Sequence, residues 1–111
     1  MTIYVGFGRW SDGYLRDVGE KLRSGKTAAQ ANEELGLTAK AQAFNQSVPQ
    51  GLRIIGSYAP QGIGGAHPSF AESPLVRIIE TDDPAHVTWA TNYYAGYLNV
   101  AYHPYTQAAQ T

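Results

Sequence analysis

Four segments of the chain alternate apolar and polar residues with a period of two, which is typical of a half-buried β-strand. In the first segment, Ile3, Val5 and Phe7 fall on one side of the strand, and we expect this side to face helices. The other predicted strands cover residues 52–58, 75–80 and 98–103.

Apolar residues recur at helical spacing between the first and second of these strands, and again after the third. Ser11 and Thr27 are suited to cap two helices, because a hydroxyl can accept a hydrogen bond from the first helical turn. Asp82 or Asp83 is suited to cap the last helix. The order strand, helices, strand, strand, helix, strand is the split βαβ pattern of ferredoxin-like folds. The sequence therefore predicts one α+β domain over residues 1–111, with helices on one face of a four-stranded antiparallel sheet.

A long segment, residues 60–74, joins the second and third predicted strands and is rich in Gly and Pro. Hairpin loops usually have roughly two to five residues, and longer loops are often functional. Ile63, His67 and Phe70 offer contacts to a bound molecule. We expect this loop to cover the mouth of a pocket.

Composition and charge narrow the classes of function. Of the 111 residues, 43% are hydrophobic and 15% are charged, and no apolar run is long enough to span a membrane. The net charge of −1 lacks the basic field that nucleic-acid binding needs. The N-terminus enters a strand without a signal peptide, which predicts a cytoplasmic protein. We therefore expect neither a membrane nor a nucleic acid among the partners.

Cysteine is absent from the chain, so thiolate chemistry is excluded. His67, His86 and His103 do not follow a spacing that is typical of metal sites. The sequence thus predicts neither a metal site nor a bound cofactor.

A set of polar residues is expected on the side of the sheet away from the helices. On the last strand, His103 and Asn99 lie opposite the apolar stripe that faces the helices. Alternation on the first and third predicted strands places Tyr4 and Arg77 on this outer side as well. Ser57, on the second predicted strand, is a further candidate. An arginine there would hold a carboxylate or an enolate by charge-assisted hydrogen bonds, and a histidine would carry a proton.

Two interpretations of this outer side follow. Ile55, Ile79 and Ala101 are expected among the polar residues, and exposed apolar sheet faces generally mark interfaces. The first interpretation is a homodimer that buries the polar set as a hydrogen-bonded network. The second is that part of the set lines a ligand cavity.

Another candidate pocket lies between the sheet and the helices. Its predicted lining consists of five aromatic residues: Phe7, Trp10, Tyr14, Trp89 and Tyr93. Aromatic side chains at such positions either fill a core or an interface, or they contact a ligand. The sequence leaves both alternatives open.

Residues 53–58 (RIIGSY) and residues 76–83 (VRIIETDD), which lead into the last helix, resemble the dimeric α+β barrel superfamily, and within it the short GYD-type proteins. Residues 74–105 also resemble the matching part of small aromatic polyketide cyclases, through IETDD at 79–83 and YHPY at 102–105. The resemblance implies a homodimer in which two open sheets pair face to face. It further implies cofactor-free chemistry of the isomerase, cyclase or monooxygenase type on a small, often aromatic, substrate.

Three hypotheses about function follow from these observations. The first is a cofactor-free enzyme in which His103 carries a proton and Arg77 stabilises an anion. The second is a binding or regulatory module whose aromatic patch recruits a small organic ligand or a protein. The third is a purely structural dimer.

Overall fold

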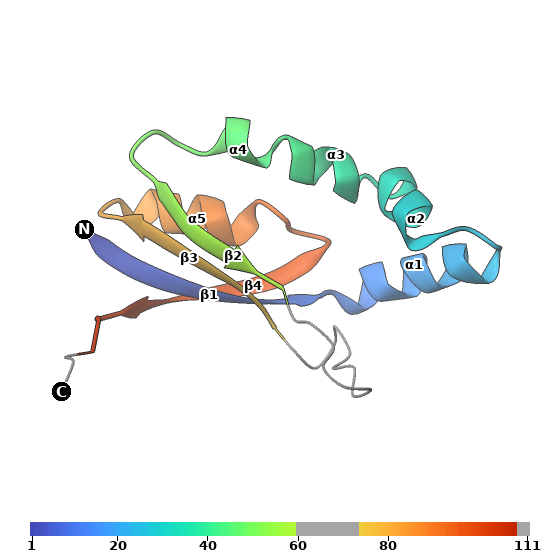
Figure 1. Cartoon of the computed structure of the whole chain (residues 1–111), viewed down its shortest axis with the longest axis horizontal. Helices are drawn as coiled ribbons and strands as arrows, with labels where there is room; N and C mark the ends of the chain where they lie inside the picture. Colours follow the sequence, from blue (N-terminus) through green and yellow to red (C-terminus); the bar gives the residue numbers. More distant parts are fainter. Residues whose placement is uncertain (60–73, 109–111) are drawn as a thin grey trace.

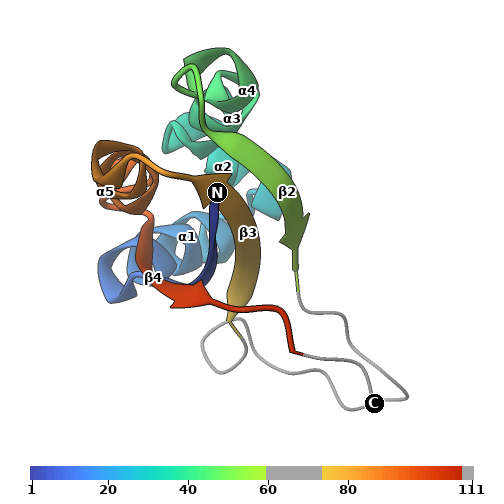
Figure 2. The ribbon, with the colours of Figure 1, turned by 90° about the vertical axis from the view of Figure 1, so that its left-hand side faces the viewer.

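The computed structural model describes residues 1–59 and 74–108, which form four strands and five helices (Figure 1). In chain order these are β1 (Thr2–Trp10), α1 (Asp12–Arg23), α2 (Ala28–Glu34), α3 (Leu37–Gln42), α4 (Phe44–Ser47), β2 (Arg53–Tyr58), β3 (Leu75–Thr81), α5 (Pro84–Asn92) and β4 (Leu98–Tyr105). The strands form one antiparallel sheet in the order β2-β3-β1-β4. Figure 2 shows the helices gathered on one side of this sheet. The predicted α+β, ferredoxin-like fold is therefore confirmed.

The helices begin where the sequence predicts caps. The Ser11 hydroxyl accepts the N–H of Tyr14 at 3.1 Å at the start of α1. Thr27 forms a capping box with Gln30 at the start of α2, and the Asp83 carboxylate caps α5. These side chains satisfy backbone N–H groups that a helix leaves without a partner in its first turn.

The side of β1 that faces the helices is the opposite of the predicted one. β1 pairs with β3 so that Gly6 lies opposite Arg77. Gly6 and Gly8 are buried, whereas Phe7 is 36% exposed. The prediction that Ile3, Val5 and Phe7 face the helices is therefore wrong.

The reason for this reversal is that a ring from the neighbouring strand occupies the helix side of β1. A Cβ atom on Gly6 would lie 2.3 Å from Cε1 of Tyr102, so the phenol ring fills the space above the glycine. Hydrophobic alternation does not reveal such an arrangement, because glycine contributes no side chain to the pattern.

The same register reverses the predicted sides of β3. Arg77 lies on the helix side together with Ile79, which is 0% exposed and belongs to the core. The predicted outer placement of both residues is wrong, as is that of Tyr4, which packs against the same core cluster. On β4 the predicted alternation is confirmed, since the ring of His103 lies on the outer side, 6.4 Å from that of Phe7.

Two apolar clusters join the helices to the sheet. One contains the buried residues Tyr14, Leu37, Phe44 and Tyr94. The other contains Leu52, Ile79 and Ala90. The long crossover between β1 and β2 therefore packs onto the sheet through the first cluster, by way of α3 and α4.

Large apolar side chains are exposed on the outer side of the sheet. Phe7 lies 6.5 Å from Tyr105, measured between ring centroids, and Tyr105 is 51% exposed. Ile55 is 43% exposed at a shift in the register between β2 and β3. Of the three apolar residues that were expected here, Ile55 and Ala101 are exposed and Ile79 is not.

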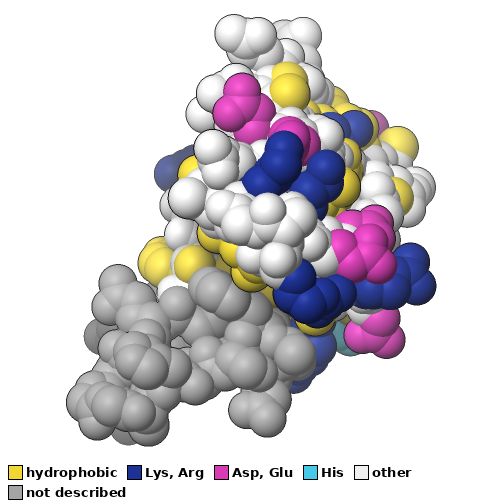
Figure 3. Space-filling model, turned by 90° about the vertical axis from the view of Figure 1, so that its right-hand side faces the viewer, with side chains coloured by type: hydrophobic (Ala, Val, Ile, Leu, Met, Phe, Trp, Pro, Cys, Tyr) yellow, Lys and Arg dark blue, Asp and Glu magenta, His cyan; other side chains and the backbone are white. Residues whose placement is uncertain are grey.

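The end of the molecule that is formed by α1 and α2 carries charges of both signs, which are interspersed in Figure 3. Lys21 lies 3.8 Å from the Glu34 carboxylate, and Lys26 pairs with the same group. Among the residues that the structure describes, no helix has the length and apolar character that crossing a membrane requires.

Candidate functional site

Arg77 is the centre of the candidate site. It projects from β3 to the helix side of the sheet and is half-buried. Its Nε–H donates a hydrogen bond to the hydroxyl of Ser57 on β2, at 2.9 Å. The guanidinium carbon lies 4.1 Å from the ring centroid of Phe44 on α4 and 5.7 Å from that of Tyr94. Two strands and the crossover thus fix the position of one cation.

Two phenols lie close to this cation, and both interact with it electrostatically. Burial raises the pKa of Tyr94 and of Tyr102 above the usual 10.0, while the charge of Arg77 and its hydrogen bonding act in the opposite direction. Both hydroxyls therefore remain protonated near neutral pH. A protonated phenol can donate a hydrogen bond to an anion and can also accept one from arginine.

The Arg77 guanidinium has no carboxylate partner in the described part of the chain. The ion pairs found there join other groups, and none of them includes Arg77. A charge that is removed from water loses favourable hydration free energy. The attraction of a nearby opposite charge compensates part of this loss. An anionic ligand would supply such a charge.

A cavity of about 180 Å³ adjoins Arg77. Its described lining is mostly apolar and consists of Gly6, Gly8, Ser57, Tyr58, Ala59, Leu75, Val76, Arg77, Leu98, Val100 and Tyr102. At Gly8 an added Cβ would meet Val100 Cγ2 at 3.1 Å, and the next atom only at 3.9 Å. Gly8 therefore contributes only backbone to the floor of the cavity, with Val100 beside it.

The structure divides the predicted polar set between the two sides of the sheet. Ser57 and Arg77 are brought together at the cavity. Tyr4 is on the same side but packs into the core. His103 and Asn99 lie on the outer side. Within one chain, His103 and Arg77 thus do not share a pocket, because adjacent strands present them to opposite faces.

Asn99 lines a separate hollow of about 390 Å³ at the outer side of β1 and β4, together with Trp10. This hollow also contains Asp12 and Arg9, so charges of both signs line it. The described lining of this hollow contains no tyrosine, unlike that of the cavity at Arg77. The cavity at Arg77 therefore offers the more defined chemistry.

The aromatic residues of the second predicted pocket mainly fill the core. Trp10 stacks on Tyr14 at 5.3 Å, and the Tyr14 hydroxyl donates a hydrogen bond to Asn32. Trp89 and Tyr93 both contact Phe44, at centroid distances of 5.7 and 5.2 Å. None of the predicted members of this pocket lines the cavity at Arg77.

Sequence reasoning missed Phe44, Tyr94 and Tyr102 as neighbours of Arg77. One signal for the cavity was present in the sequence, namely the two glycines in alternate positions of β1. Glycine inside a strand often marks a close approach of another group to the backbone. The predicted loop contacts Ile63, His67 and Phe70 lie outside the described residues.

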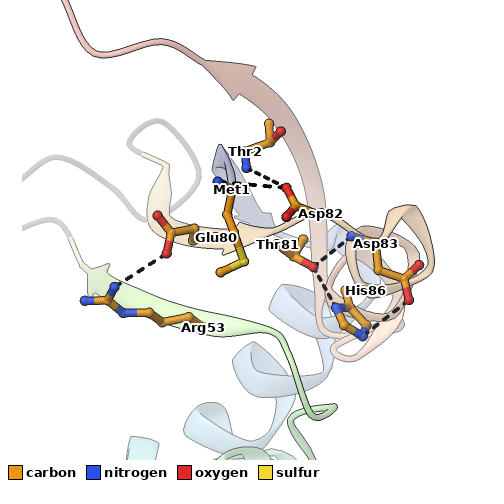
Figure 4. Close-up of polar contacts among 8 residues, drawn as sticks. All are labelled: Met1, Thr2, Arg53, Glu80, Thr81, Asp82, Asp83 and His86. Atoms are coloured by element: carbon orange, nitrogen blue, oxygen red, sulfur yellow. Dashed lines mark hydrogen bonds and ion pairs between the residues drawn. The ribbon is translucent and has the colours of Figure 1, made fainter.

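A separate polar cluster joins the end of β3 to the start of α5 (Figure 4). The buried Thr81 hydroxyl accepts the N–H of Asp83 at 3.1 Å and is hydrogen-bonded to Nδ1 of His86 at 2.7 Å. The Asp83 carboxylate accepts the N–H of Ala85 at 2.9 Å. These contacts are internal to the protein, and they position α5.

Residues 1–59 and 74–108 contain no group of three or more potential metal ligands. A comparison with protein-family models and with curated proteins finds no match for this chain. The resemblance to GYD-type proteins and polyketide cyclases therefore stays a prediction.

Proposed function

We propose that this protein binds a small organic molecule in the cavity between the sheet and the helices, with Arg77 as its polar anchor. The observation that carries this proposal is a half-buried arginine, without a carboxylate partner among the described residues, beside a mostly apolar cavity. Ligand pockets typically combine an apolar lining with a few fixed polar groups. The Ser57 and Phe44 contacts provide that fixed geometry.

Cofactor-free catalysis remains the more specific form of the same proposal. Arg77 would stabilise a carboxylate or an enolate, and the nearby protonated Tyr102 hydroxyl would donate a hydrogen bond or a proton to it. The phenol replaces His103 in this role, because His103 lies across the sheet from Arg77. A non-catalytic binding or regulatory protein is the alternative, and it needs only the cavity and its cation.

The proposed assembly is a homodimer through the outer side of the sheet. Phe7, Tyr105 and Ile55 expose apolar surface there, and a second copy would cover it in a two-fold arrangement. The resemblance to dimeric α+β barrels supports the same arrangement. The cavity at Arg77 lies on the helix side, so each copy would hold a site of its own.

Replacement of Gly8 by alanine tests the cavity. The added methyl group projects into the cavity floor and requires Val100 to move by a few tenths of an ångström. Gly8→Ala should therefore fold and should bind benzoate at least about fivefold more weakly, because the methyl group overpacks the filled site. Isothermal titration of both proteins with benzoate measures this difference.

Gly13→Ala is the matched control, since an added Cβ on Gly13 of α1 meets only the end of the Arg16 side chain, at 3.9 Å. This variant should bind benzoate as the unmodified protein does. Equal affinities of the Gly8→Ala variant and the unmodified protein would contradict the proposed site.

A further inference from the structure

We infer that the ligand of this cavity is a singly charged planar oxyanion, a carboxylate or an enolate, with a compact apolar body. This inference rests on the binding function proposed above. It specifies the class of molecule and the direction from which the anion reaches Arg77.

The planar shape of the anion follows from the groups that already surround the guanidinium. Phe44 covers one face of it at 4.1 Å, and Ser57 accepts the Nε–H. The remaining N–H groups lie in the guanidinium plane, beside the hydroxyls of Tyr94 and Tyr102, and they form the fork that matches two carboxylate oxygens. An anion therefore binds at the edge of Arg77, in the plane that Phe44 and Ser57 maintain.

The single charge follows from the charges along the cavity. Among the described lining residues, Arg77 is the only one with a charged side chain. A dicarboxylate or a phosphate monoester would bring a second negative charge against Leu75, Leu98 and Val100, where nothing in the described lining compensates it. Burial of such an uncompensated charge is strongly unfavourable.

The compact apolar body follows from the size and the floor of the cavity. A volume of about 180 Å³ is close to that of an engineered apolar cavity of about 150 Å³ that accepts benzene. Gly8 contributes no side chain to the cavity floor, where Val100 Cγ2 is the nearest side-chain atom, so a flat group can lie on the sheet beside Val100. A single ring or a short branched chain fits these limits.

Phe44 acts as a positioning residue in this arrangement. It belongs to α4 of the crossover, and its ring also stacks on Trp89 and Tyr94. It is thus anchored in the core while it restricts the guanidinium plane. Removal of the Phe44 ring should weaken the binding of an anion more than the binding of a neutral molecule of the same shape.

The test compares benzoate with benzamide, which has the same ring and nearly the same shape but no charge. In isothermal titrations, the unmodified protein should bind benzoate about ten- to hundredfold more tightly than benzamide, as expected for a hydrogen-bonded ion pair. Phthalate, which adds a second carboxylate, should bind more weakly than benzoate. Arg77→Met should bind benzoate and benzamide equally.

Four further variants complete this test. Arg77→Lys keeps the positive charge but loses the two parallel N–H donors of the guanidinium, so we expect an intermediate preference for benzoate. This variant replaces Arg77→Met in the test if Arg77→Met does not fold. Phe44→Leu should reduce the preference for benzoate, and Phe44→Tyr should restore it. Arg53→Met is the matched control, because Arg53 pairs with Glu80 at 3.5 Å and does not line the cavity.

The outcomes separate this inference from the proposed function. Equal binding of benzoate and benzamide to the unmodified protein, with both weakened in Gly8→Ala, would overturn the anion assignment and leave the cavity as the binding site. Binding of neither probe at millimolar concentration would overturn both. A preference for benzoate that persists in Arg77→Met would place the anion at another cation and would also overturn the inference.

Discussion

Arg77 and Ser57 show what can be inferred at the scale of single residues. The sequence identifies both as members of one polar set, and the structure joins them by a hydrogen bond of 2.9 Å. Their side of the sheet is predicted wrongly, because Gly6 and Gly8 hide the true helix-facing side of β1. Tyr102 could not be selected either, since its place above Gly6 depends on the register of β4 against β1.

Three phenols with raised pKa values predict how stability depends on pH. Burial is the main cause that raises the pKa of Tyr14, Tyr94 and Tyr102 above 10.0. The folded state therefore holds these protons more tightly than the unfolded state does, so the stabilising contribution is complete below the unfolded pKa. It is lost as the pH rises from about 10 through the folded-state pKa values.

Thermal melting between about pH 8 and about pH 11 checks this dependence. The melting temperature should fall at the alkaline end, and Tyr102→Phe should make that fall shallower. Tyr105→Phe is the control, because Tyr105 is 51% exposed. Identical slopes for the unmodified protein and the Tyr102→Phe variant would contradict the role assigned to burial.

At the scale of elements, local signals predict the strands and the caps well, because each cap depends on a few neighbouring residues. Ser11, Thr27 and Asp83 act as expected. The placement of the crossover over Arg77 could not be predicted, since it depends on contacts between distant segments. Phe44 of α4 contacts Arg77 while its ring also packs against Trp89 of α5 and against Tyr93 at the end of that helix.

The crossover is attached to the segment after α5 by tyrosine hydroxyl groups. Tyr97 donates a hydrogen bond to the Leu35 carbonyl at 2.8 Å, and Tyr93 donates one to the Lys40 carbonyl at 2.7 Å. Tyr97→Phe should lower the free energy of unfolding by about 0.5 to 1.5 kcal/mol, the usual contribution of one hydrogen bond. Amide hydrogen exchange in α2 and α3 should become faster.

Tyr58→Phe provides the comparison for this variant, because Tyr58 is 59% exposed. Its exchange rates in α2 and α3 should equal those of the unmodified protein. Unchanged exchange in Tyr97→Phe would show that the hydroxyl does not hold the crossover in place.

At the scale of the whole molecule, the two sides of the sheet have different roles in this account. The helix side holds the cavity and Arg77. The outer side exposes Phe7, Tyr105 and Ile55 and is assigned to a second copy. The fold class is predictable from the order of elements, whereas the division of polar residues between the two sides requires the strand register.

The proposed homodimer gives a direct expectation for mass. Light scattering at micromolar concentration should report about twice the chain mass of 12.0 kDa. Phe7→Asp should yield a monomer, because a carboxylate on the apolar interface would be buried without a partner. Leu22→Asp, which changes an exposed apolar residue on α1, should stay dimeric. A monomeric unmodified protein would contradict the assembly.

The most direct test of the central claim is a titration of the methyl resonances with benzoate, because the methyl groups report on the two sides of the sheet separately. Leu75, Leu98 and Val100 line the cavity on the helix side, whereas Val5 and Ile78 lie on the outer side. The account predicts shifts that saturate together at the first three residues, with the other two unchanged. Saturating shifts at Val5 and Ile78 alone, or no shift at any of the five residues, would contradict it.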